Sequence, residues 1–152
     1  MRRLADALYA VILTLWVGGL WAIGYLVAPT LFSSLSDRAL AGVVAGKLFA
    51  LIGWVGLGGG GYLLVFMRLR HGAAAWRNWS FRLLLAMWLL AAASLFGIQP
   101  LMAQMKADAL PLDVMESALR GRFAAWHGIS SVLYLLQSLF GLWVVAAARN
   151  KA

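Results

Sequence analysis

The chain has 152 residues, of which 64% are hydrophobic and only 12% are charged, and it contains no cysteine. Soluble domains average roughly 45–50% apolar and about 25% charged residues, so this composition excludes an ordinary soluble enzyme, a disordered tail and a disulfide-rich secreted domain. The net charge of +8 comes from basic residues that lie between long apolar runs, which favours lipid headgroups over nucleic acid as their counter-charge.

Four apolar stretches are long enough to cross a bilayer as helices, because a span needs about 20 predominantly apolar residues. In chain order they cover residues 7–32, 39–67, 83–105 and 123–148. The first is much longer than the apolar region of a cleaved signal peptide, so we expect it to be retained. The sequence therefore predicts an all-α integral membrane four-helix bundle that forms one transmembrane domain over residues 1–152.

The distribution of lysine and arginine predicts the orientation of this bundle. With four spans, both termini share a side with the second loop, and that side carries Arg2, Arg3, Arg68, Arg70, Arg77, Arg82, Arg149 and Lys151. The opposite side carries Arg38, Lys106, Arg120 and Arg122, together with most of the acidic residues. Because cytoplasmic loops are enriched in basic residues, we expect both termini to be cytoplasmic, in the plasma (inner) membrane.

Small residues recur along one face of each of the first three spans. On the second span five glycines fall within an arc of roughly 80° at 100° per residue. Small residues let helix backbones approach closely in a membrane, so we assign the following to helix packing: Gly18, Pro29, Gly42, Gly46, Gly53, Gly56, Gly60 and Pro100.

Ionisable and polar residues at membrane depth are the candidates for function, because such groups are costly in hydrocarbon. Lys47 can either snorkel to the headgroups or face the bundle interior. The fourth span carries a polar stripe, for which hydrogen bonding between helices is the alternative explanation. Pro29 and Pro100 each free a carbonyl at a similar depth. We expect an outward-facing polar pocket, with these ligand-binding candidates: Tyr25, Lys47, Gln99, His127, Ser130, Ser131 and Tyr134.

Several short motifs resemble the transmembrane-protein-205-like family of four-helix membrane proteins. They are Trp16-Val17-Gly18-Gly19, Ala28-Pro29-Thr30-Leu31-Phe32, Gly46-Lys47-Leu48-Phe49, Pro100, and His127-Gly128-Ile129-Ser130-Ser131. The family is largely of unknown function, and a link of eukaryotic relatives to platinum-drug resistance implies handling of metals or cationic compounds. The family pattern has an acidic residue before the third-helix proline, where this chain has Gln99. The first motif also resembles the first helix of copper-resistance D membrane proteins.

The leading hypothesis is a small-molecule or metal/cation binding or permeation protein, and the alternative is a non-catalytic scaffold or assembly partner. No cofactor is predicted. A haem or redox protein is a lesser alternative, and Met102, Met105 and His127 are the weak candidates for a Cu(I) site. A serine hydrolase built on His127 lacks an orienting acid and an oxyanion hole, so we expect no enzyme. The expected partners are membrane lipids and a second copy or another membrane protein, with no nucleic acid.

Overall fold

The computed structural model describes residues 2–110 and 112–149, and every regular element in these ranges is helical. Segments η1 and η3 are π-helices, in which the backbone bonds span one residue more than in an α-helix, and η2 is a 3-10 helix. In chain order the elements are α1 (Arg2–Trp21), η1 (Ala22–Val27), α2 (Ala28–Ser34), α3 (Arg38–His71), η2 (Gly72–Arg77), α4 (Trp79–Ala93), η3 (Ser94–Ile98), α5 (Gln99–Ala109) and α6 (Arg120–Arg149).

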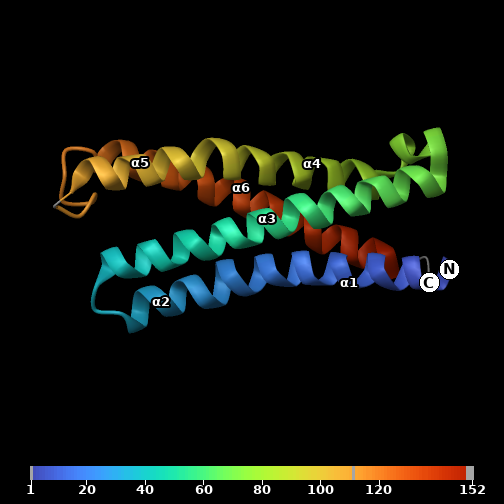
Figure 1. The fold of residues 1–152 in the computed structure, drawn as a ribbon, viewed down its shortest axis with the longest axis horizontal. Coiled ribbons are helices and arrows are strands. Elements are labelled where there is room, and N and C mark those ends of the chain that lie inside the picture. The colour runs from blue at the N-terminus through green and yellow to red at the C-terminus, as the bar shows by residue number, and fades with distance from the viewer. Residues whose placement is uncertain (1, 111, 150–152) are drawn as a thin grey trace.

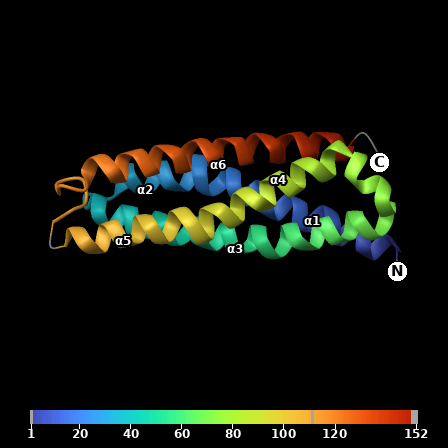
Figure 2. The same cartoon turned by 90° about the horizontal axis from the view of Figure 1, so that it is seen from above.

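These elements form four long rods that lie side by side (Figures 1 and 2). The first rod runs through α1, η1 and α2, the second is α3, the third runs through α4, η3 and α5, and the fourth is α6. In the part of the chain that the structure describes, four helices are long and apolar enough to cross a membrane. The prediction of an all-helical protein with four helices long and apolar enough to cross a membrane is therefore confirmed for the described residues.

The connections between rods gather at the two ends of the bundle. The α2–α3 and α5–α6 connections lie at one end, which we call the loop end (Figure 1). The start of α1, the η2 segment and the last turns of α6 lie at the other, which we call the terminal end. Charged residues outside the apolar spans are thus sorted into two separate groups.

Side-chain caps fix where two of the rods begin. The Asp37 carboxylate accepts a hydrogen bond from the Leu40 amide at 3.0 Å and so caps α3. The Asn78 side chain accepts one from the Ser80 amide at 3.0 Å and caps α4. At the end of α3, Gly72 has a φ of 56°, which favours glycine and ends the helix.

A π-helical turn lies just ahead of each proline that interrupts a rod. The Ala28 amide bonds to the Ile23 carbonyl ahead of Pro29, and the Gln99 amide bonds to the Ser94 carbonyl ahead of Pro100. Proline lacks the amide hydrogen that an α-helix would use, and the wider turn shifts the bonding pattern locally. Both rods therefore continue past the proline.

The main apolar core lies between α1, α3 and α4, and α6 closes it. Trp16 is fully buried at its centre. A Cβ at Gly56 would lie 2.6 Å from the Trp16 Nε1 atom, and one at Gly60 would lie 2.8 Å from its Cζ3 atom. The indole of Trp88 donates to the Leu57 carbonyl at 2.9 Å. Gly56 and Gly60, two of the predicted packing glycines, therefore form the surface against which the Trp16 ring packs.

The remaining packing glycines divide into two groups. A Cβ at Gly53 would lie 3.2 Å from Leu95, and one at Gly42 would lie 3.5 Å from the Lys106 ammonium. Gly18 and Gly46 instead lie on the exposed surface, with open space where a Cβ would stand. Their assignment to packing within the chain is corrected here, because the other rods cover a face of each helix that excludes these two positions.

Gly24, which the sequence analysis did not single out, is covered by the ring of Tyr134. The Tyr134 hydroxyl donates to the Leu20 carbonyl at 2.6 Å, near the end of α1 and just before η1 begins. A Cβ at Gly24 would collide with the ring, which that hydrogen bond holds in place. The absence of a side chain at Gly24 therefore allows α6 to approach η1.

We expect Gly24→Ala to lower the stability of the protein by about 1–3 kcal/mol, the usual cost of overpacking. Gly18→Ala is the matched control on the same rod, because its new methyl group meets open space and alanine is favoured over glycine in a helix by about 0.5–1 kcal/mol. Thermal unfolding in detergent measures both. Equal melting temperatures for the two variants would contradict this role of Gly24.

Candidate functional site

Lys47 lies on the outer surface of α3. Its side chain is exposed, as are those of Val43, Leu51 and Trp54 on the same face of the helix, whereas Ala45 is buried on another face. Lys47 therefore faces outward from the bundle and not into its interior. Its long aliphatic stem lets the ammonium reach the headgroup region from there.

His127 is also exposed, near the start of α6. Its ring stacks on Phe123 with 6.2 Å between the ring centroids and 8° between the planes. The Ser131 hydroxyl donates to the backbone carbonyl of His127 at 2.8 Å, and Ser130 is half-buried. The Ser131 hydroxyl therefore bonds to its own helix rather than to the imidazole.

Tyr25 and Tyr134 are the candidates that the structure brings together. Their rings lie 6.3 Å apart between centroids, Phe49 meets Tyr134 edge-on at 5.1 Å, and Trp21 lies 4.8 Å from Tyr25. The Tyr134 hydroxyl is already used by the Leu20 carbonyl. This group is an aromatic contact between α6, η1 and α3 that contains no charged residue.

Two buried polar side chains of α6 bond to backbone carbonyls. Gln137 is buried and donates to the Met87 carbonyl at 3.2 Å, and Ser138 donates to the Tyr134 carbonyl at 2.8 Å. Gln99 is half-buried, and its amide nitrogen would lie 3.9 Å from a Cβ at Gly53. Of these contacts, the bond from Gln137 joins α6 to α4, as hydrogen bonding between helices requires, whereas the bond from Ser138 stays within α6.

The seven ligand-binding candidates therefore do not converge on one pocket at membrane depth. Lys47 and His127 face outward, Tyr134 is bonded to backbone, and none of the seven lines either of the two cavities described below. The wheel positions of these residues could not reveal this spread, since a wheel orders the residues of one helix and does not place its neighbours.

The two methionines proposed for copper lie in a small second core at the loop end. Met105 is buried there with Phe123, and Met102 and Trp126 pack against them. His127 is exposed beside this core rather than inside it. Within residues 2–110 and 112–149, no group of three histidine, aspartate or glutamate side chains could hold a metal ion.

Lys106, which its place in the sequence predicts to be a loop charge, is half-buried at the loop end. Its ammonium donates to the Gly42 carbonyl at 3.1 Å and lies 5.6 Å from the centre of the Phe123 ring. These two contacts join α5 to α3 and to α6. One signal could have found it: if the third helix continues to Ala109, Lys106 shares a face with Met102 and Ala109.

A cleft of about 620 Å³ opens at the loop end, between the two connections. Its lining residues come from the two connections and from the first residues of α3 and α6. They are Ser36, Asp37, Arg38, Ala39, Asp113, Met115, Glu116 and Arg120. Three carboxylates and two guanidinium groups therefore surround one cavity. The cavity lies at the end of the bundle that carries most of the acidic residues, and none of the seven ligand-binding candidates lines it.

The charges around this cleft are largely available to a ligand. Among the residues that the structure describes, the ion pair present is Arg70 with Asp6, at the terminal end. Within the cleft, Asp37 and Asp113 each use one carboxylate oxygen to cap a backbone amide. The remaining charged side chains of the lining make no hydrogen bond within the described residues.

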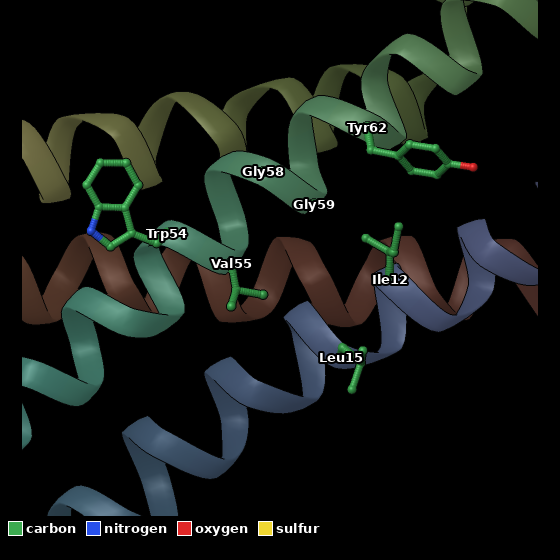
Figure 3. Close-up of a pocket in the computed structure, with 7 residues that line it drawn as sticks. All are labelled: Ile12, Leu15, Trp54, Val55, Gly58, Gly59 and Tyr62. Atoms are coloured by element: carbon green, nitrogen blue, oxygen red, sulfur yellow. The ribbon is translucent and has the colours of Figure 1, made fainter.

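A second cavity, of about 350 Å³, is an apolar groove on the outer surface between α1 and α3 (Figure 3). It is lined by Ile12, Leu15, Trp54, Val55, Gly58, Gly59 and Tyr62. The groove lies within the membrane-crossing part of both helices.

Residues 11–111 match the model of a family described as "Domain of unknown function (DUF4149)". The chain belongs to the DUF4149 family. The matched region covers most of the first rod and all of the second and third, and it stops before α6. Trp16 and the glycines that it packs against, Gly56 and Gly60, thus lie inside the DUF4149 region. The part of the cleft that Asp113, Glu116 and Arg120 contribute lies beyond it. No curated protein and no solved structure matches the chain.

Proposed function

We propose that this chain is a non-enzymatic multi-pass membrane protein that binds a small zwitterionic molecule in the loop-end cleft. The observation that carries the proposal is the set of three carboxylates and two guanidinium groups that line one cavity without ion pairs among them. Guanidinium groups bind carboxylates and phosphates in bidentate geometry, and carboxylates accept hydrogen bonds from ammonium groups. A ligand that carries both charges can satisfy both kinds of residue.

Binding on the non-cytoplasmic side is part of this proposal. The terminal end carries the greater number of basic residues, which supports cytoplasmic termini and a loop end that faces outward from the plasma (inner) membrane. An outward cleft is reached by solutes without crossing the bilayer. We assign it binding rather than permeation, because the interior glutamine and serine at 137 and 138 bond to backbone carbonyls of the bundle.

We also propose that the chain is related to the transmembrane-protein-205-like family. That resemblance supports a ligand with cationic character. Gln99 in place of an acid before Pro100 argues against a carboxylate-bound metal ion on the third rod, and the mixed charges that line the cleft support an organic zwitterion there. We propose no resident haem, copper or other cofactor. A second copy of the chain or another membrane protein remains the proposed macromolecular partner, and the scaffold function is the alternative that the following experiment separates.

Native mass spectrometry of the whole protein, released gently from its own membrane, tests the proposal. We expect a reproducible small-molecule adduct on the wild-type chain. Glu116→Gln and Arg120→Gln should each lose most of it, because each removes one charge that the ligand needs. Asp108→Asn and Arg122→Gln are the matched controls, since both residues are exposed near the loop end but outside the cleft lining, and both should retain the adduct.

His127→Ala distinguishes this cleft from a pocket at membrane depth. We expect the variant to keep the adduct, because His127 does not line the cleft. Loss of the adduct in His127→Ala alone would contradict the cleft. A bare mass, or one accompanied by another protein, would favour the scaffold.

A further inference from the structure

The apolar groove between α1 and α3 has the shape of a site for one flexible chain. Trp54 and Tyr62 stand at its two ends along α3, and Ile12 of α1 points toward α3 near the Tyr62 end (Figure 3). Water is absent at this depth of a bilayer, so the groove is filled by an apolar group.

Gly58 keeps the groove open without taking part in packing. A Cβ at Gly58 would meet nothing within 4 Å, whereas one at the adjacent Gly59 would lie 2.9 Å from the Ile12 side chain. A larger residue at position 58 would therefore fill the groove without disturbing the contact of α1 with α3.

A row of three side chains leads from the groove to the terminal end. Tyr62, Phe66 and Arg70 lie four residues apart and so share one face of α3. The rings of Tyr62 and Phe66 stack at 6.2 Å, and the Arg70 guanidinium lies 5.7 Å from the centre of the Phe66 ring. Arg70 also pairs with Asp6 through its Nη1 atom, which leaves other donors of the guanidinium for a second anion.

The positive charge of the terminal end favours a molecule with an anionic group. The described side chains of the terminal end include one acidic residue, Asp6, against the basic residues Arg3, Arg68, Arg70, Arg77 and Arg82. Gly58 lies twelve residues from Arg70, which is about 18 Å along a helix, close to the ~15 Å depth of one hydrocarbon leaflet. An anionic headgroup at Arg70 would thus place an acyl chain at the groove.

We propose that an anionic glycerophospholipid binds here, with one acyl chain in the groove and its phosphate at Arg70. Asp6 competes with that phosphate for the guanidinium. This site lies at the opposite end of the bundle from the cleft and does not depend on the function proposed for it.

Native mass spectrometry of the full chain in detergent, titrated separately with dioleoylphosphatidylglycerol and dioleoylphosphatidylcholine, tests the site. We expect tighter binding of phosphatidylglycerol. Arg70→Gln should weaken it about fivefold, as expected for one basic residue near an anionic lipid, and Gly58→Leu should weaken it by blocking the groove. Asp6→Asn should strengthen it, because the competing carboxylate is gone.

Two controls separate a specific site from general attraction. Arg77→Gln removes an exposed charge at the same end, and Gly46→Leu adds the same side chain to open surface elsewhere on α3. Both should bind phosphatidylglycerol as the wild type does. Equal weakening in Arg77→Gln, unchanged binding in Gly58→Leu or weaker binding in Asp6→Asn would each overturn the proposal. So would a mass of two copies that disappears in Gly58→Leu, because a second copy would then occupy the groove.

Discussion

Trp16→Ala is expected to destabilise this protein by about 3–5 kcal/mol, the range for removing a large aromatic side chain from a core. Trp16 is fully buried, and its ring covers Gly56 and Gly60, so its removal leaves a cavity between α1 and α3. Its indole nitrogen is buried without a hydrogen-bond partner, so the loss comes from packing alone. The midpoint of unfolding in mixed micelles of increasing SDS fraction measures the effect.

Trp54→Ala provides the control for Trp16→Ala, because it removes the same side chain from a position that is 58% exposed. We expect a small shift of the midpoint for Trp54→Ala. A shift as large as that of Trp16→Ala would show that loss of any tryptophan, rather than of the central one, weakens the bundle.

Gly60→Leu should destabilise the protein by about 1–3 kcal/mol or more, through overpacking at the same place. A Cβ at Gly60 would lie 2.8 Å from Trp16 and 2.9 Å from Trp88. Neither ring can move aside easily, since Trp16 is fully buried and Trp88 is held by its hydrogen bond to the Leu57 carbonyl. The same unfolding experiment applies, and Gly46→Leu, with open space around it, should unfold close to the wild-type midpoint.

The double variant with Trp16→Ala and Gly60→Leu tests whether the two residues act through one contact. Neighbouring substitutions are not additive when they share a cavity. The leucine at position 60 should occupy part of the space that Trp16 leaves, so the double variant should be more stable than the sum of the two losses predicts. Simple additivity would mean that the clash at Gly60 involves Trp88 and not Trp16.

The four rods were predictable because hydropathy over about 20 residues reports directly on the solvent around a helix. Pro29 and Pro100 were correctly placed within the first and third rods, but the sequence gives no sign of how a rod absorbs a proline. The sequence predicts a freed carbonyl near each proline, but it does not predict the π-helical turn that the structure has ahead of each one.

The candidate site was harder to predict, because a wheel position does not say which neighbour covers it. Lys47 lies roughly opposite Gly56 and Gly60 on α3 and is exposed. Lys106, in contrast, is half-buried between Gly42 and Phe123. The difference depends on where α5 ends and how it crosses α3. Likewise, Asp37 and Glu116 are far apart in the sequence, and they line one cleft only because two connections meet at the loop end.

The uninterrupted length of α3 sets the height of the whole molecule relative to the membrane. Its 34 residues correspond to about 51 Å, against a hydrocarbon thickness of about 30 Å. Even a tilt of about 40° leaves roughly 39 Å of vertical extent. A bundle of this height exceeds the hydrocarbon layer of a bilayer, so in a membrane its two charged ends would lie among the headgroups. Solutes and lipid headgroups would therefore contact the charged ends before they contact the apolar middle of the bundle.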